Sequence, residues 1–378
     1  MSAADASFRG TNAAQLRVLV IGSVGPNQDR LLALARHVSS LVYAYTEFHP
    51  NLIRLEPQIP CIAIARRNLV PQVEFLVARY SIDVIYSLLN ASDESTEVTL
   101  ELLDSSLNTP IVRHYKEHPC VATREEKRVL CETDGQIYIN EESYDYFAAT
   151  YHVAPSSAHI LDADMISEKY MSNDLVAKKH VGDNQPHLLV AGGMTMLNDR
   201  LDVRELCQTM NLRKVHVHLY GYMACEQDGR LIVGDAATTR CYEELQTSCP
   251  YVHLHQYIPP DQFARTWSQY DAGFMHPRVS PSDRGARFEE LNLPYRYSAY
   301  LAAALPLAVP DEGQRAMKRF VQEQHVGFVY SDYEELSEIL HDYAHLDSMS
   351  SAISKRRKEY SFDAAAGRLA AILAQYAR

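Results

Sequence analysis

The chain has 378 residues, of which 47% are hydrophobic and 22% are charged, a composition typical of folded globular proteins. Because a compact domain averages roughly 150 residues, this length predicts two domains. The formal net charge of −12 disfavours a broad nucleic-acid interface, although it is compatible with a local basic pocket. We therefore expect small ligands as binding partners and no nucleic acid.

The cysteines and the N-terminus indicate the compartment. The seven cysteines are scattered and include no C-x-x-C pair, which predicts free thiols. The polar start MSAADASFRGTNAAQ has no apolar segment of the kind found in secretory signals, and no run of about 18 apolar residues occurs in the chain. The sequence thus predicts a flexible tail over residues 1–15 and a cytoplasmic protein.

Residues 16–166 alternate predicted strands and helices. The segment LRVLVIGSVGP reads as a buried strand that ends in a glycine loop, and NQDRLLALARHVSSL follows as an amphipathic helix. The same alternation continues through DVIYSLL, PIVRHY and GQIYIN, with helical segments between these strands. Apolar strands that alternate with helices imply a parallel sheet covered on both faces, so we expect an N-terminal Rossmann-like domain.

The alternation lapses over 167–185, a polar stretch that we interpret as an interdomain linker. It resumes with HLLVAGG and predicts a second doubly wound domain over 186–347. Residues 348–378 have helical periodicity without a strand partner, and we expect them to pack back toward the N-terminal domain. Two such α/β domains would face each other across a cleft lined by the carboxyl ends of their strands.

The stretch NLPYRYSAYLAAALPLAVP (292–310) places a positive charge at the start of an alanine-rich helix. Pro294 fits the first helical position, which puts Arg296 in the first turn. A cation there faces the positive end of the helix dipole, an unfavourable position unless an anion such as a phosphate lies between them. A salt bridge to Glu289 or Glu290 is the alternative.

A second feature of this domain favours an anion. Its first strand ends at Ala191-Gly192-Gly193, where the absence of side chains would let phosphates approach the backbone, and Arg200 opens the following helix. An ordinary tight turn is the alternative interpretation. Together with Arg296, these residues favour a diphosphate, the leaving group of a sugar nucleotide, whose growing charge must be stabilised during glycosyl transfer. No metal or other cofactor is required.

The predicted acceptor side lies in the first domain. VRHYKEHP concentrates His114, Lys116, Glu117 and His118 at the expected carboxyl end of a strand, where loops face the ligand. In the functional interpretation, Glu117 or a histidine orients an acceptor hydroxyl; a solvated loop is the alternative. Asn140, at the end of GQIYIN, holds an equivalent edge position.

Two further patterns are interpreted as structural. His216 with His218, and His253 with His255, share strand faces at a spacing that could bind a metal, but neither pair has a cysteine or carboxylate in register. We therefore predict no metal. The basic run SKRRKEY is interpreted as a solvated helix face, with weak contact to an anionic membrane surface as the alternative.

The run VHLHQYIPPDQFARTWSQYDAGFMHP, followed by LNLPYRYSAYLAAALPLAVP and VGFVYSDYEELSEIL, resembles the C-terminal half of GT-B glycosyltransferases related to family four. Such enzymes often carry a proline, a basic residue and then EYLAAGLP. Pro294, Arg296 and the YLAA that begins at Tyr300 match this segment. Ala299 stands where the family usually has an acidic residue that often pairs with the donor's ribose, and Ala304 stands where it has a glycine.

The resemblance implies a hexosyltransferase-like enzyme that moves a sugar from a nucleotide-sugar donor to a hydroxyl of a glycan, a lipid-linked or a small-molecule acceptor. It also implies a retaining and metal-independent reaction. The predicted site assigns the donor diphosphate to Gly192, Gly193, Arg200 and Arg296, the nucleoside or sugar to Tyr257, His276, Asn292, Tyr297 and Ser298, catalysis to His114, Glu117 and His118, and the acceptor side to Lys116 and Asn140.

Two alternatives stay open. The replacements at Ala299 and Ala304 motivate a catalytically silent GT-B protein that acts as a binding or stabilising partner. An epimerase or a phosphorylase is less favoured, because the sequence shows no lysine motif for pyridoxal phosphate and no clear pair of acids for epimerisation.

Overall fold

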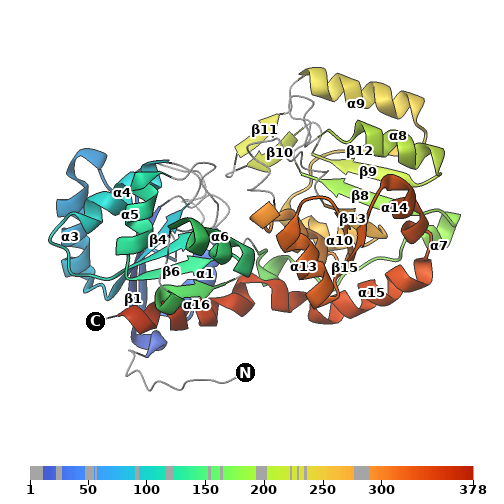
Figure 1. The fold of residues 1–378 in the computed structure, drawn as a ribbon. Coiled ribbons are helices and arrows are strands. Elements are labelled where there is room, and N and C mark those ends of the chain that lie inside the picture. Colours follow the sequence, from blue (N-terminus) through green and yellow to red (C-terminus); the bar gives the residue numbers. More distant parts are fainter. Residues whose placement is uncertain are drawn as a thin grey trace. The chain divides into compact units, whose positions relative to one another are not determined.

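The computed structural model describes residues 12–22, 28–46, 55, 58–89, 93–115, 123–151, 155–161, 165–192, 202–221, 224–227, 230–233, 236–275 and 290–377. The chain divides into two compact units (Figure 1). The first consists of Met1–Asp162 and Ala365–Arg378, and the second of Ala163–Ala364. Each unit has its own parallel sheet.

The first unit contains a seven-stranded sheet in the order β3-β2-β1-β4-β5-β6-β7. Every neighbouring pair in it is parallel. The order reverses between β1 and β4, and open α/β sheets bind ligands at the carboxyl ends of the strands at such a reversal. The strands are β1 (Arg17–Gly22), β2 (Ser40–Tyr45), β3 (Cys61–Ala63), β4 (Val84–Leu89), β5 (Ile111–Tyr115), β6 (Gly135–Tyr138) and β7 (Ala158–Ile160).

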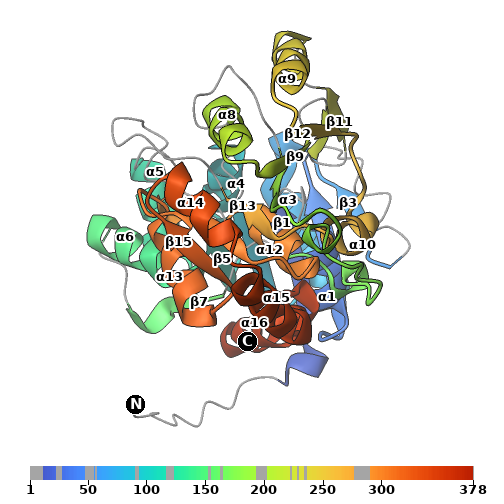
Figure 2. The same cartoon turned by 90° about the vertical axis from the view of Figure 1, so that its right-hand side faces the viewer.

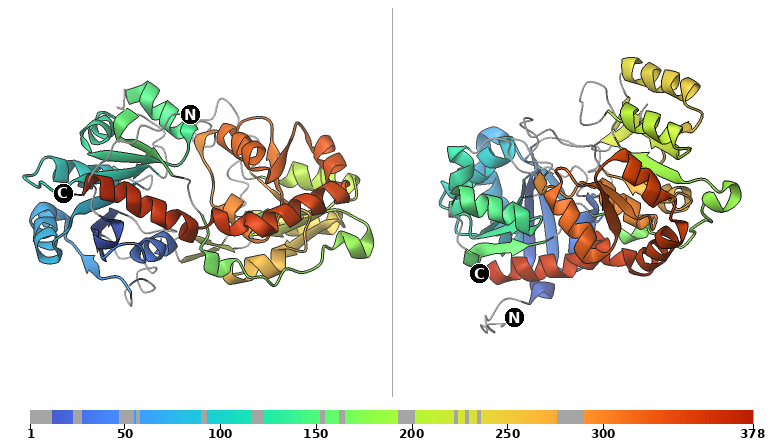
Figure 3. Two further views of the ribbon diagram at one scale, coloured as in Figure 1. Left: turned by 90° about the horizontal axis from the view of Figure 1, so that it is seen from below. Right: turned by 45° about the vertical axis from the view of Figure 1, so that its right-hand side comes forward.

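Helices cover both faces of this sheet. Successive strand residues point to opposite faces, and apolar residues on both faces are buried under these helices. Val18 and Val20 of β1 belong to one buried cluster, and Leu19 and Ile21 belong to another. The first cluster includes Leu369 of α16, which runs along this unit in red in Figure 3. The helices are α1 (Gln28–Ala35), α3 (Leu69–Tyr80), α4 (Asp93–Leu103), α5 (Arg124–Glu132), α6 (Glu141–Tyr151) and α16 (Phe362–Tyr376), with short 3-10 turns at Ala13–Gln15, Arg66–Asn68 and Pro155–Ser157.

The second unit contains a six-stranded parallel sheet in the order β12-β9-β8-β13-β14-β15, which reverses between β8 and β13. A two-stranded antiparallel ribbon, β10-β11, is an addition that the sequence pattern did not predict. The strands are β8 (His187–Ala191), β9 (His216–Tyr220), β10 (Ala224–Gln227), β11 (Arg230–Val233), β12 (Val252–His255), β13 (Ala272–Phe274), β14 (Leu307–Pro310) and β15 (Gly327–Tyr330).

The helices of the second unit also pack on its sheet. Leu206 and Met210 of α8 and Tyr242 of α9 share a buried cluster with Val217 of β9, and Figure 2 shows α8 beside β9 and β12. The helices are α7 (His180–Asp183), α8 (Arg204–Leu212), α9 (Ala236–Ser248), α10 (Phe263–Trp267), α12 (Arg296–Ala302), α13 (Arg315–Gln324), α14 (Tyr333–Leu340) and α15 (Tyr343–Arg356), with 3-10 turns at Glu168–Tyr170, Pro260–Gln262 and Arg357–Tyr360.

The stretch that the sequence assigned to a linker, 167–185, lies in the second unit and includes α7. The buried guanidinium of Arg357 donates hydrogen bonds to the carbonyl oxygens of Ser172 and Ala302, so it ties this stretch to α12. Of the C-terminal helices, α15 belongs to the second unit and most of α16 to the first.

Two expectations about the whole chain can be compared with the described residues. The cysteines described there, Cys61, Cys131, Cys207, Cys241 and Cys249, are all free thiols. Every helix in the described ranges is either too short or too polar to cross a bilayer.

We predict that Gly135→Ala destabilises the first unit. A Cβ at this position would lie 2.4 Å from the ring of Tyr376, and that ring is held because its hydroxyl bonds His159 and the carbonyl of Ser157. Overpacking of this kind costs about 1–3 kcal/mol, which urea unfolding would measure. Gly182→Ala is the control, since nothing lies within 4 Å of its added Cβ. Equal stability of the two variants would contradict the prediction.

Candidate functional site

Two glycines follow the neighbouring strands β8 and β9, beside the switch point of the second sheet. Gly192 follows β8 with φ +105° and Gly221 follows β9 with φ +104°, in the region that side chains rarely adopt. A Cβ on Gly221 would lie 2.4 Å from the carbonyl oxygen of Gly192, and the Gly192 N–H donates to the Tyr220 carbonyl. The two backbones therefore approach closely at two positions that carry no side chain.

Arg296 lies directly against Gly192. A Cβ at position 192 would lie 2.6 Å from the Nη2 atom of Arg296, so the guanidinium occupies the space that a side chain would take. Arg296 is half-buried and forms no ion pair with any carboxylate in the described part of the chain, including Glu290. Glu289, the other predicted partner, lies outside the described residues. The structure thus brings together two of the predicted diphosphate residues, and Gly193 and Arg200 also lie outside the described ranges.

Tyr300 fixes the position of α12 and hence of Arg296. Its hydroxyl accepts a hydrogen bond from the Ala191 N–H at 2.8 Å and donates one to the Phe274 carbonyl at 3.1 Å. It therefore joins the carboxyl ends of β8 and β13 from inside the unit. Burial raises the pKa of Tyr300 to about 12, and the charge of Arg296 acts in the opposite direction. The ring also packs where a Cβ on Gly273 would stand.

The helix α12 begins at Arg296, two residues after the predicted first position at Pro294. Its N-cap, Tyr295, makes no side-chain capping bond. Pro294 precedes the helix and accepts a hydrogen bond from the Tyr297 N–H. Because a seven-residue helix has a small dipole, the charge at this edge comes chiefly from the Arg296 guanidinium.

Two of the remaining predicted donor residues, Tyr297 and Ser298, have buried side chains. Tyr297 is buried, and its ring meets Phe320 edge-on with centroids 5.0 Å apart. Ser298 is fully buried, and its hydroxyl donates to the Tyr295 carbonyl within the same turn. Both side chains lie inside the unit, which favours structural roles over the predicted donor contacts. Asn292 and Tyr257 are half-buried, and His276 lies outside the described residues.

In the first unit, His114 lies in the interior and not on an exposed loop. Its Nδ1 atom is 2.7 Å from the Tyr86 hydroxyl and 3.0 Å from Nη1 of Arg30. Since a guanidinium only donates hydrogen bonds, the ring nitrogen that it contacts must be an acceptor. Three side chains from α1, β4 and β5 thus converge here. The sequence reasoning missed Arg30 and Tyr86; Lys116, Glu117 and His118 lie outside the described residues.

Arg30 could have been found by the signal that identified Arg296. It lies in the first turn of the helix that follows the first strand, as a cation near a helix N-terminus. Asn140, in contrast, has a local explanation. Its Oδ1 accepts a hydrogen bond from the Ser143 N–H at 2.7 Å, which caps α6. This buried capping role accounts for an asparagine at the end of β6 without an acceptor.

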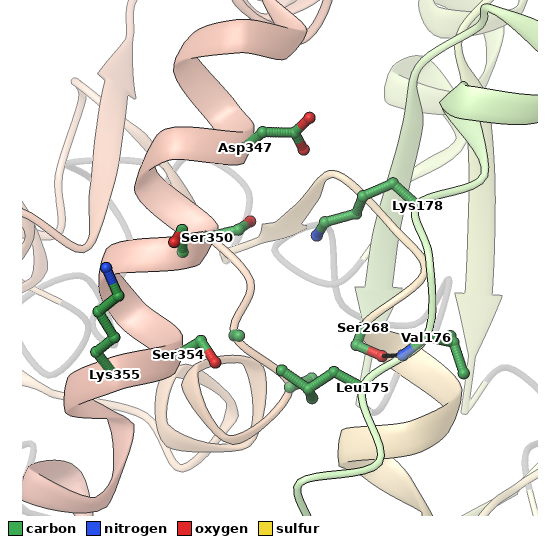
Figure 4. A pocket seen from close by; sticks show the side chains of 11 residues that line it. Leu175, Val176, Lys178, Ser268, Asp347, Ser350, Ser354 and Lys355 are labelled. Carbon is green, nitrogen blue, oxygen red and sulfur yellow. Dashed lines mark hydrogen bonds between the residues drawn. The ribbon is translucent and has the colours of Figure 1, made fainter.

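A separate pocket of about 350 Å³ lies in the second unit (Figure 4). Lys178 points into it and also donates to the Tyr270 carbonyl. Burial lowers the pKa of Lys178 to about 8, against the opposing effects of Asp271 and Asp347. The pocket lies at the carboxyl end of α12, next to Ala303 and Ala304, whereas Arg296 and Gly192 lie at the start of that helix, so the two places are distinct. Its lining is Leu175, Val176, Lys178, Ser268, Ala303, Ala304, Asp347, Ser350, Ser351, Ser354 and Lys355.

We predict that Tyr300→Phe destabilises the second unit by about 1–3 kcal/mol, because it leaves the buried Ala191 N–H and Phe274 carbonyl without the hydroxyl that joins them. Denaturant unfolding would measure the loss. Tyr251→Phe is the matched control, since the Tyr251 hydroxyl has no hydrogen-bond partner among the described residues. A loss no larger than that of the control would show that the hydroxyl does not hold the edge.

Comparisons with known proteins agree with this architecture. Residues 234–359 match the family model for the C-terminal domain of glucosyltransferase 3-like proteins. A search of curated protein sequences finds no match to the chain.

Solved structures match over nearly the whole chain. A glycosyltransferase from Rickettsia africae ESF-5 has a TM-score of 0.67 at 10% identity and covers 96% of this chain and 98% of its own. Anabaena HepE in complex with UDP has a TM-score of 0.64 at 14% identity, over 95% and 99% of the two chains. A UDP-N-acetylglucosamine 2-epimerase from Listeria monocytogenes, described as putative, has a TM-score of 0.55 at 11% identity, over 95% and 96%. The predicted fold, with two Rossmann-like units of the GT-B type, is confirmed.

Proposed function

We propose that the chain is a glycosyltransferase that moves a sugar from a nucleotide-sugar donor to a hydroxyl acceptor. The observation that carries this proposal is the Arg296 guanidinium, which lies against Gly192 at the switch point of the second sheet and has no carboxylate partner among the described residues. A half-buried cation at a backbone edge without side chains fits a phosphate oxygen better than it fits solvent.

The donor diphosphate is both held and activated by this arrangement. A guanidinium presents several N–H donors in a fixed plane and can contact two phosphate oxygens at once. As the bond to the sugar breaks, negative charge grows on the diphosphate, and a positive group held in place stabilises it without reorganisation. Tyr300 keeps that group in place by its bonds to β8 and β13.

A uridine nucleotide is the donor to test first. The HepE structures with this fold contain UDP or UDP-glucose, and residues 234–359 match a glucosyltransferase-like model. A metal-independent reaction follows from giving Arg296 the task of neutralising the leaving group. Retention of configuration rests on the family resemblance alone.

The acceptor side is proposed in the first unit, near the carboxyl ends of β4 and β5. His114, Tyr86 and Arg30 form its described part. Lys116, Glu117 and His118 follow β5 in the sequence and stay predicted contacts. The cytoplasmic location and weak membrane contact through SKRRKEY also stay predictions from the sequence.

The first test is thermal unfolding against nucleoside diphosphates and their sugars. A ligand at about 100 times its dissociation constant stabilises the protein by roughly 2.7 kcal/mol. We expect a shift selective for uridine nucleotides that Arg296→Ala abolishes. Arg213→Ala is the control, because Arg213 forms an exposed ion pair with Glu334 at the far end of α8. An equal shift in the wild type and the Arg296 variant would reject the assignment of the diphosphate to Arg296.

The second test is turnover. Arg296→Ala should lower sugar transfer by about 10²–10³-fold, the effect of losing one donor to a developing anion, while the melting temperature without ligand stays unchanged. Near-normal turnover would contradict the catalytic role of Arg296. Failure of the wild type to cleave any sugar nucleotide would favour the silent partner, and release of an epimerised sugar nucleotide would favour the epimerase.

A further inference from the structure

Five histidines lie on three neighbouring strands of the second sheet, and four of them form a continuous stack. His187 and His216 are the first residues of β8 and β9, and their rings lie parallel with centroids 4.5 Å apart. His216 stacks on His253 at 4.9 Å, and His253 stacks on His218 at 4.7 Å. The fifth ring, His255, stacks on Tyr220. These strand histidines were expected from the sequence to share faces; His187 was not anticipated.

Hydrogen bonds order these rings into two chains. In the first, Nε2 of His187 lies 2.9 Å from Asp183, Nδ1 of His187 lies 2.9 Å from Nε2 of His218, and Nδ1 of His218 lies 2.9 Å from Nε2 of His255. Because the Asp183 carboxylate accepts, each imidazole in this chain carries its proton on Nε2 and accepts at Nδ1.

The second chain is shorter and runs in parallel. Nε2 of His216 lies 2.7 Å from the side-chain oxygen of Gln185, and Nδ1 of His216 lies 2.7 Å from Nε2 of His253. The two chains therefore end side by side, on Asp183 and on Gln185. The Gln185 N–H also donates to Asp183, which fixes the loop that leads from α7 into β8.

A metal ion binds an imidazole through a nitrogen lone pair, which a neutral ring carries on one of its two nitrogens.

We propose that Asp183, His187 and His216 bind a divalent transition-metal ion of the zinc class. One ligand atom from each residue lies within 4.8 Å of the others. Imidazole nitrogen and carboxylate oxygen are ligands that zinc accepts at about 2.0–2.2 Å. Asp183 has a 43% exposed side chain, so an ion can enter from solvent and the carboxylate can move toward it. The Gln185 oxygen stands beside His216 as a further donor.

The two chains supply the support that metal-bound histidines need. A histidine that binds metal through Nε2 carries its proton on Nδ1 and donates it to a neighbour, which orients the ring. When the protons of both chains move from Nε2 to Nδ1, His187 donates to Nε2 of His218 and His216 donates to Nε2 of His253. Binding also requires the two stacked rings to tilt, and nearby Lys179 opposes a cation.

This site is remote from the proposed chemistry. It lies at the first residues of β8 and β9, whereas Gly192 and Arg296 lie beyond the last residue of β8. The ion is thus structural, and the inference does not depend on the proposed function.

The test is a titration of metal-free, tag-free protein with Zn²⁺ by calorimetry, followed by Co²⁺, whose visible absorption reports nitrogen and oxygen ligands. We expect one ion per chain. Asp183→Asn and His216→Gln should each weaken binding by about 100-fold or more, since loss of even an outer partner costs 10–100-fold. Asp183→Asn is the safer variant for folding because it is nearly isosteric and exposed.

His345→Gln is the control for adventitious binding by a surface histidine of the same unit, and its affinity should equal that of the wild type. Lys179→Gln should tighten binding, because it removes a positive charge near the rings. Absence of Zn²⁺ binding by the wild type would overturn the proposal and leave the stack with a packing role. Unchanged affinity in either ligand variant would overturn it too, because both residues are assigned as ligands.

Discussion

The contact between the Tyr300 hydroxyl and the ends of β8 and β13 is the constraint on which the candidate site depends. The two strands flank the switch point, and a single buried oxygen joins the Ala191 N–H on one side to the Phe274 carbonyl on the other. The same residue sits one helical turn after Arg296, so the bond that closes the sheet edge also sets the position of the charge. A ligand that arrives at this edge meets a guanidinium already held in place, which is the condition for strong electrostatic stabilisation.

The first unit shows a related arrangement around its own switch point. Gly22 ends β1 with φ +128°, its Cβ would lie 2.4 Å from the Leu88 carbonyl oxygen, and the Tyr43 hydroxyl donates to the Gly22 carbonyl. In each unit a tyrosine hydroxyl therefore bonds the backbone where a first strand ends, and an arginine lies in the first turn of a nearby helix. The chemistry differs in one respect: Arg30 faces His114, whereas Arg296 faces a bare backbone. This contrast is why the diphosphate is assigned to the second unit.

Sequence reasoning could predict the two sheets and could single out Gly192 and Arg296. Strand periodicity, a glycine after a strand and a cation at a helix start are all local signals. It could not show that Gly192 and Arg296 touch, since a contact between residues so far apart in the chain is decided by packing. The role of the Tyr300 hydroxyl was missed for another reason. The spacing of Tyr300 along the helix marks it as a core residue, and the partners of its hydroxyl lie on strands that are distant in the sequence. Ser298 and Asn140 each bond the local backbone, so the polar pattern that suggested ligand contacts also fits a structural role near a helix start.

Ala299 and Ala304, the two departures from the family segment, have different consequences for the candidate site. Ala304 has φ +57°, the left-handed conformation that a glycine adopts freely, and the Leu305 N–H still bonds the Tyr300 carbonyl to close the helix. An alanine in this conformation costs about 1–2 kcal/mol relative to a glycine, and the helix still closes at this position. Ala299 is different, because it is buried and has no polar group to offer a ribose. A catalytically silent protein would therefore have lost nucleoside recognition at Ala299, and not phosphate binding at Arg296. A measurement of selectivity among the bases would reveal that loss of nucleoside recognition.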